Sequence, residues 1–170
     1  MFLDARAQWL TPPVRVLTEL TRPSLVLVYA LVVAAVAAFR SRPRWAYLPV
    51  AVLSANLLSH VLKAVIGRER PGLELQLVYE YNPAMPSGHA MGAAAFAMAV
   101  TLLLAGRRPW LVAGLWALAA AIGLTRLYLG VHWFTDVLAG YVLGAVVAVG
   151  VWAGWRFFVR RHGRSELAQG

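Results

Sequence analysis

The 170-residue chain contains no cysteine, which excludes disulfide bonds, thiolate metal sites and thiol catalysis. Charged residues are scarce as well: they make up 14% of the chain, against about 25% of an average soluble domain. Hydrophobic residues make up 61%, and the mean hydropathy is +0.65. A chain this apolar is unsuited to a water-soluble globule, so we expect a single compact membrane domain.

Acidic residues are the rarest charged class, with 7 Asp and Glu against 16 Lys and Arg, which gives a net charge of +9. Such a charge is compatible with a nucleic-acid partner. The arginines flank apolar segments, however, as the positive-inside rule for membrane proteins expects, and we predict no nucleic-acid partner. The few carboxylates form no obvious magnesium cage, so we expect neither a metal nor another cofactor.

Long apolar runs predict an all-α fold, a polytopic membrane helix bundle with about five transmembrane helices. The expected spans are residues 24–39, 45–65, 89–105, 110–129 and 134–157. Residues 1–21 carry charges in every apolar run, and we expect one or two interfacial helices there, broken at Pro12-Pro13. We find no internal repeat. The whole chain, 1–170, is therefore predicted to be one domain, with the bundle at 24–157 and a cytoplasmic tail at 158–170.

The loops between five spans alternate between the two sides of the membrane. One side has Glu166 as its only acid, and its cations are Arg40, Arg42, Arg44, Arg107, Arg108, Arg156, Arg160, Arg161 and Arg164. The other side holds the remaining acids together with Arg6, Arg15, Arg22, Lys63, Arg68, Arg70 and Arg126. Because cytoplasmic loops are enriched in Lys and Arg, we expect the first side in the cytoplasm and the second outside, in a plasma membrane.

Three polar clusters fall on the expected outer side. Lys63, the only lysine, and Arg70 stand almost two helical turns apart at the end of the second span. Pro86-Ser87-Gly88-His89 precedes the third span; Ser87 suits an N-cap, and the free N–H groups of a helix start bind phosphate. Alone, the first cluster reads as a snorkelling lysine and the second as an ordinary capped helix.

The third cluster holds His132 and Asp136, which a helix would place on one face. A carboxylate that accepts a proton from one imidazole nitrogen fixes the tautomer and leaves the other nitrogen free to react. Arg126 lies upstream, and Gly130 allows the chain to turn between them. Alone, this group is a helix-end salt bridge with a packing histidine. Cations and histidines from three clusters at one membrane face indicate an anion site.

In this order the clusters resemble the three-part signature of the type-2 phosphatidic acid phosphatase superfamily, which includes integral-membrane lipid phosphatases and soluble vanadium haloperoxidases. The matching residues are Lys63-x6-Arg70-Pro71, Pro86-Ser87-Gly88-His89 and Thr125-Arg126-x5-His132-x3-Asp136. Thr125 stands where the family usually has serine, and membrane members commonly have six spans. The resemblance implies that His132 attacks phosphorus, that Asp136 orients it, and that His89 protonates the leaving oxygen and then activates water. It implies that the phosphate is bound by Lys63, Arg70, Ser87, Gly88 and Arg126.

The family implies polyprenyl diphosphates, phosphatidylglycerophosphate or phosphatidic acid as substrates. We favour an undecaprenyl-type polyprenyl diphosphate, because an outward-facing phosphatase fits the recycling of carrier lipids. A vanadate-dependent haloperoxidase would use a similar anion cage, but five apolar spans favour a lipid. A non-catalytic anion binder or transporter would need no oriented histidine. We expect a monomer in which Gly140 and Gly144, and also Gly150 and Gly154, bring the last span close to a neighbour within the chain.

Overall fold

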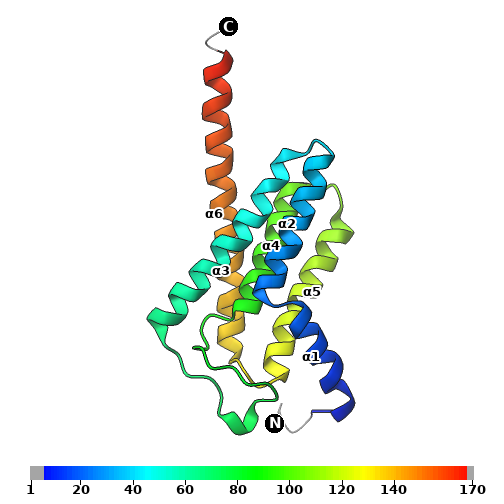
Figure 1. The fold of residues 1–170 in the computed structure, drawn as a ribbon, viewed down its shortest axis with the longest axis vertical. Helices are drawn as coiled ribbons and strands as arrows, with labels where there is room; N and C mark the ends of the chain where they lie inside the picture. Colours follow the sequence, from blue (N-terminus) through cyan, green and yellow to red (C-terminus); the bar gives the residue numbers. More distant parts are fainter. Residues whose placement is uncertain (1–5, 168–170) are drawn as a thin grey trace.

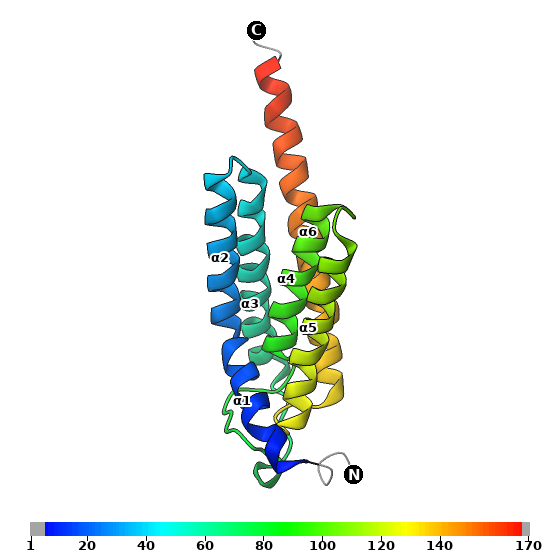
Figure 2. The same cartoon turned by 90° about the vertical axis from the view of Figure 1, so that its right-hand side faces the viewer.

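The computed structural model describes residues 6–167 and the side chains of residues 6–161. The elements of this range are helices, which confirms the all-α prediction. The α-helices are α1 (Thr11–Leu20), α2 (Pro23–Phe39), α3 (Tyr47–Ile66), α4 (Gly88–Leu104), α5 (Pro109–Tyr128) and α6 (Phe134–Leu167). Short 3₁₀ turns cover Gln8–Leu10, Pro43–Ala46 and Leu73–Leu75. Figures 1 and 2 show α2 to α6 running along one bundle axis, with α6 extending past the others.

Helix α4 is the centre of the bundle, where it contacts α2, α3, α5 and α6. Its many alanines are buried and let the neighbouring backbones approach closely. A Cβ at Gly140 of α6 would lie 2.7 Å from the Ser87 carbonyl, and one at Gly144 only 2.2 Å from the Met91 carbonyl. The predicted close contact within the chain is thus confirmed for this pair. It is wrong for Gly150 and Gly154, around which the described residues leave open space.

All five predicted apolar segments are helical, and three regions are long and apolar enough to cross a membrane on their own: Pro43–Ile66, Pro109–Tyr128 and Phe134–Arg161. Helix α2 reaches that length together with α1, from which it is bent by 55°. Helix α4 has 17 residues and rises about 25 Å, slightly less than a hydrocarbon core of ~30 Å. The protein is a multi-pass membrane protein, and apolar side chains remain exposed along the outer faces of these helices.

Two element boundaries differ from the prediction. Pro12 and Pro13 do not break a helix; they lie in the first turn of α1, where a missing N–H leaves no helical bond unmade. The bend comes instead just before Pro23. Helix α6 continues past the predicted end of the last span to Leu167, since no proline follows Pro109 to stop it.

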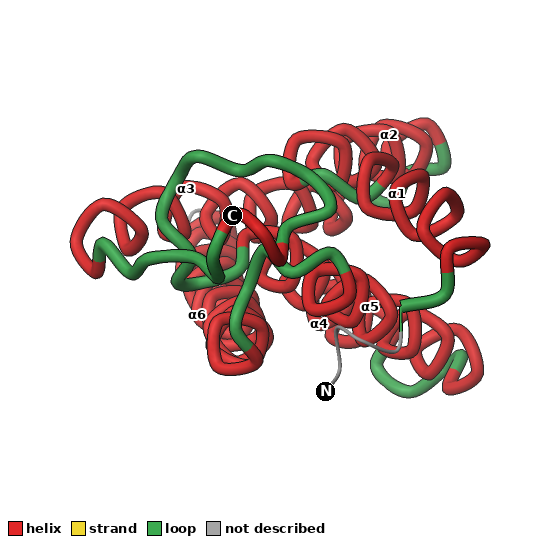
Figure 3. Tube along the Cα trace, turned by 90° about the horizontal axis from the view of Figure 1, so that it is seen from below, coloured by secondary structure: helices red, strands yellow, loops and turns green. Residues whose placement is uncertain are grey.

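The α3–α4 loop, residues 67–87, lies at the same end of the bundle as α1 (Figure 3). The backbone N–H of Leu77 donates to the carbonyl of Leu129 at 2.9 Å, and Arg15 of α1 donates to the carbonyl of Leu77 at 2.5 Å. Leu77 and Val78 pack against the buried α5–α6 turn, whereas Tyr79 and Tyr81 are exposed. The α3–α4 loop is therefore fastened to both neighbours, and it closes one side of a cavity.

Candidate active site

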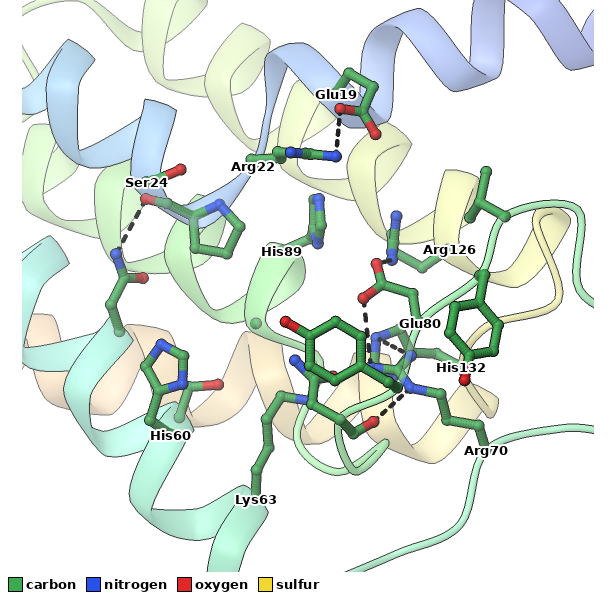
Figure 4. A pocket seen from close by; sticks show the side chains of 18 residues that line it. Glu19, Arg22, Ser24, His60, Lys63, Arg70, Glu80, His89, Arg126 and His132 are labelled. Carbon is green, nitrogen blue, oxygen red and sulfur yellow. Dashed lines mark hydrogen bonds and ion pairs between the residues drawn. The ribbon is translucent and has the colours of Figure 1, made fainter.

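A cavity of about 490 Å³ lies at this end of the bundle, and side chains from α1 to α5 and from the connecting turns surround it (Figure 4). The sequence-predicted residues that line it are Lys63, Arg70, Gly88, His89, Arg126 and His132. Two predicted residues do not line it. Asp136 is fully buried behind His132, and Ser87 is fully buried just before α4. The three clusters, distant in the sequence, therefore meet around one space.

His132 lies in the turn before α6, not on the helix as its spacing from Asp136 suggested. Gly130 makes this turn possible: its φ is +69°, and a Cβ there would lie 2.1 Å from the Leu75 carbonyl. Asp136 is in the first turn of α6, and its Oδ2 accepts the backbone N–H of Trp133 at 2.8 Å. The same oxygen lies 3.4 Å from Nδ1 of His132. Helix capping thus aims the carboxylate at the imidazole.

Two contacts specify the tautomer of His132. Nη1 of Arg70 lies 3.3 Å from Nε2 of the imidazole, and a guanidinium can only donate, so Nε2 is the acceptor. The hydrogen is then on Nδ1, which faces the Asp136 carboxylate. Burial lowers the pKa of His132 to about 4; the adjacent Asp136 carboxylate opposes this shift, and the nearby Arg70 cation adds to it. At neutral pH the imidazole is uncharged and has a lone pair on Nε2.

The cations around the cavity are held by the backbone. Arg70 donates to the carbonyls of Val131 and Asn82, each at 2.6 Å, and to the Asn82 side chain. The Lys63 ammonium donates to the carbonyl of Pro83 and lies 3.4 Å from that of Ala84. These neutral partners fix the side chains and leave their charges available to an anion.

Arg126 forms a close ion pair with an acid of the α3–α4 loop. It is 2% exposed, donates to the Thr18 hydroxyl at 2.5 Å and pairs with Glu80 at 2.6 Å. The Glu80 carboxylate also lies 4.0 Å from Arg70, and Figure 4 shows it among these cations and His132. A carboxylate of the α3–α4 loop therefore occupies the centre of the predicted anion site.

Replacing Glu80 with glutamine is expected to tighten the binding of inorganic phosphate several-fold, since the anion no longer competes with a carboxylate for Arg126. The variant should also unfold at a lower temperature without phosphate, because a buried guanidinium loses its counter-charge. Isothermal titration with phosphate and thermal unfolding measure the two effects. The matched control is Glu74→Gln in the same loop, where the side chain is exposed. Equal phosphate affinity in Glu80→Gln and wild type would contradict the proposed competition between phosphate and the Glu80 carboxylate for Arg126.

The start of α4 departs from the prediction in one respect. Ser87 stands at the N-cap position, but its side chain makes no capping hydrogen bond. Its buried Oγ has no hydrogen-bond partner among the described residues, while its backbone N–H donates to the Asp136 carbonyl at 3.0 Å. The Ser87 hydroxyl is therefore a buried polar group with unused hydrogen-bonding capacity, which argues for a partner other than protein.

His89 has a contact that the sequence did not indicate. Its Nε2 lies 3.2 Å from the backbone carbonyl of Thr18 in α1. A carbonyl can only accept, so Nε2 carries the hydrogen, and Nδ1 of the neutral ring is an acceptor. The N-terminal segment, expected to be an interfacial appendage, thus contacts both His89 and Arg126 through one residue.

Three residues of this region escaped sequence reasoning: Thr18, Glu80 and Arg68, whose guanidinium pairs with Asp136 at 2.8 Å. Glu80 is one of three acids in the α3–α4 loop, with Glu69 and Glu74, so its sequence position alone did not single it out. Arg68, only two residues before Arg70, also stood inside the first cluster. Thr18 had no signal, since its role comes from the packing of α1 on α5.

A neutral histidine backed by a carboxylate, in a cavity surrounded by cations at one end of a membrane bundle, is the arrangement of a membrane phosphatase. Residues 44–160 match the family model described as the PAP2 superfamily, and the chain belongs to that superfamily. It is accordingly a lipid phosphatase of the membrane. The match covers α3 to α5, most of α6 and the three clusters.

Two known proteins and one crystal structure illustrate the similarity. The chain is 33% identical over 153 residues to phosphatidylglycerophosphatase B of Bacillus subtilis, covering 84% of this chain and 73% of that protein. A crystal structure of a transmembrane PAP2-type phosphatidylglycerolphosphate phosphatase from Bacillus subtilis superposes with a TM-score of 0.80 at 29% identity, covering 93% of this chain and 82% of the other. The undecaprenyl-diphosphatase of Sulfolobus acidocaldarius is 32% identical over 114 residues, or 64% of this chain and 54% of that protein.

Proposed function

We propose that the protein hydrolyses a lipid phosphate or diphosphate through a phosphohistidine formed on His132. The observation that carries the proposal is the orientation of this ring, with Nδ1 toward Asp136 and the Nε2 lone pair beside Arg70 at the cavity. Nε2 attacks phosphorus, the bond from phosphorus to the leaving oxygen breaks, and Asp136 stabilises the cationic phosphohistidine. Water then attacks phosphorus, His89 takes its proton, and phosphate leaves with His132 restored.

The phosphoryl oxygens are bound by the residues that the sequence singled out. Lys63, Arg70 and Arg126 supply positive charge that matches the charge spread over an in-line transition state. The unpartnered Ser87 hydroxyl and the Gly88 N–H at the start of α4 supply neutral donors. Glu80 must move or become protonated when the phosphate reaches Arg126, so binding exchanges one anion for another.

For the substrate, we favour a polyprenyl diphosphate, and the tautomer of His89 supports this choice. With Nε2–H bound to Thr18, neutral His89 has only an acceptor nitrogen left, which suits activation of water. Protonating an alkoxide would require a second proton on the ring. A diphosphate expels a phosphate monoester, whose second pKa is about 6, so it departs without a proton.

A second candidate is phosphatidylglycerophosphate. Its support is the similarity to phosphatidylglycerophosphatase B, which extends over 84% of this chain. That substrate expels the alkoxide of a glycerol, so it needs His89 as a general acid. The two candidates therefore differ in what they demand of one side chain.

The purified protein should release phosphate from a polyprenyl diphosphate, with phosphatidylglycerophosphate and phosphatidic acid as the comparison substrates. Release should continue in a strong chelator, because the proposed reaction needs no metal, and it should fall with vanadate, which mimics the pentacoordinate phosphoryl centre. Among the described residues no group of three His, Cys, Asp or Glu side chains is placed to hold a metal ion. A requirement for magnesium, or release of phosphate from none of these lipids, would contradict the proposal.

We also propose that the active site faces outward and the C-terminus faces the cytoplasm, on the basis of the arginine distribution. The α2–α3 and α3–α4 loops lie at opposite ends of the bundle (Figure 1). Since the chain has no cysteine, Ser41→Cys and Tyr81→Cys each carry one thiol. In intact cells an impermeant maleimide should label Tyr81→Cys but not Ser41→Cys, and permeabilised cells should show both. Labelling of Ser41→Cys alone in intact cells would reverse the orientation.

A further inference from the structure

Arg68 contacts Asp136, the carboxylate that orients the proposed nucleophile His132, from outside the cavity. Its Nη1 lies 2.8 Å from Oδ1 of Asp136 and 2.6 Å from the Thr135 hydroxyl. Its guanidinium carbon lies 5.9 Å from the centre of the Trp133 ring. Arg68 does not line the cavity that Lys63, Arg70 and Arg126 share, so it belongs to a different set of contacts from the phosphate-binding cations.

The two oxygens of Asp136 have separate partners. Oδ1 is bound by Arg68, whereas Oδ2 accepts the Trp133 N–H and faces the His132 ring. A carboxylate held at both oxygens cannot rotate, so Oδ2 stays directed at the imidazole. Asp136 is fully buried, and an unpaired carboxylate there would be strongly disfavoured. Arg68 therefore meets both needs of this group, a fixed plane and a counter-charge.

The same contacts connect two clusters that the sequence separates. Trp133 donates from its ring nitrogen to the Glu69 carbonyl at 3.0 Å, beside the Arg68 stacking contact. The segment after α3 is thus joined to the turn that carries His132. The first cluster therefore helps to position the proposed nucleophile as well as to bind phosphate.

We propose that Arg68 is a positioning residue, which acts through Asp136 to hold His132 in its attacking orientation. This inference rests on the proposed function and adds a residue to its mechanism. Arg68 does not line the cavity proposed for the phosphoryl oxygens, and its effect reaches the reaction only through the carboxylate. Removing it should slow formation of the phosphoenzyme without weakening phosphate binding.

The first experiment is a double-mutant cycle on the single-turnover rate of phosphoenzyme formation. Arg68→Gln should lower this rate roughly 10–100-fold, the range for groups that orient a reactive ligand, and Asp136→Asn should lower it by about 10⁴. Adding Arg68→Gln to Asp136→Asn should change the rate less than about threefold, because the carboxylate through which Arg68 acts is gone. Additive losses would overturn the proposal.

Phosphate binding separates the positioning role from a binding role. Arg68→Gln should bind inorganic phosphate as wild type does, whereas Arg70→Gln should bind it at least about tenfold more weakly. Arg68→Lys keeps the charge and should recover part of the lost rate; if Arg68→Gln does not fold, the cycle is run with Arg68→Lys. Arg40→Gln removes an exposed arginine from the opposite end of the bundle and should change neither quantity. Equal losses of phosphate affinity in Arg68→Gln and Arg70→Gln would overturn the proposal.

A spectroscopic measurement tests the inference without relying on turnover. The chain has 4 histidines, so protein labelled with ¹⁵N-histidine gives few ring signals to assign. Wild type and Arg40→Gln should show the low-field Nδ1–H proton of His132 directed at Asp136, and Arg68→Gln and Asp136→Asn should lose it. If the wild-type protein hydrolysed no lipid phosphate, the proposed function would be wrong. The Nδ1–H signal would still show whether Arg68 holds His132 and Asp136 in place. An unchanged signal in Arg68→Gln would overturn that role.

Discussion

Replacing His132 with alanine is expected to reduce lipid phosphate hydrolysis by roughly 10⁵–10⁶, close to the uncatalysed background. The variant loses the atom that attacks phosphorus, and among the cavity residues no other neutral imidazole is backed by a carboxylate. The cations remain in place, held by backbone carbonyls and Glu80, so inorganic phosphate should still bind. Steady-state turnover and phosphate titration measure the two properties separately.

His60→Ala is the matched control, because it removes an exposed histidine that lines the same cavity but has no assigned role in the proposed reaction. It should retain activity within about threefold of wild type. Substantial turnover in His132→Ala, with the fold intact, would remove the nucleophile assignment. Loss of phosphate binding along with activity would instead mean that the alanine variant disturbs the cavity.

His89→Ala should reduce phosphoenzyme formation from phosphatidic acid by roughly 10²–10⁴, the usual contribution of a general acid. Formation from a polyprenyl diphosphate should fall less than about tenfold, because its leaving group needs no proton. The later hydrolysis of the phosphoenzyme should slow equally for both substrates, since His89 activates water in that common step. Single-turnover measurements separate the first step from the second.

Equal losses in phosphoenzyme formation on both substrates would show that His89 is not the leaving-group acid. It would then be assigned to phosphate binding or to the water step alone. A second variant, Thr18→Val, retains the backbone carbonyl that binds Nε2 but removes the hydroxyl that binds Arg126. It should leave unchanged the ratio of the phosphoenzyme-formation rates on the two substrates. This result would distinguish an effect of the His89 ring from an effect of its surroundings.

Much of the architecture could be predicted because bilayer-length apolar runs are local features. The five apolar segments became helices, and the motif spacing indicated which loops would meet. The end of α6 was harder to place, since arginines continue a helix as readily as apolar residues do. The prolines at the start of α1 were misread because proline both ends one helix and begins another.

The contacts that complete the candidate site could not be predicted in the same way. Thr18 approaches His89 only because α1 bends at 55° from α2 and packs on α5. Glu80 reaches Arg126 because the α3–α4 loop is fastened at Leu77. Even the His132–Asp136 pair, correctly associated by its spacing, is built by a turn and a helix start instead of one helical face. Each of these contacts depends on tertiary packing.

The most direct test of the account is rapid-quench analysis with a ³²P-labelled polyprenyl diphosphate, followed by mapping of the labelled peptide. We expect a burst of protein-bound label that is stable in alkali, labile in acid and located on His132, as a phosphohistidine requires. A burst that carries label on another residue would contradict the central claim. So would steady phosphate release with no labelled protein at any time within the first turnover.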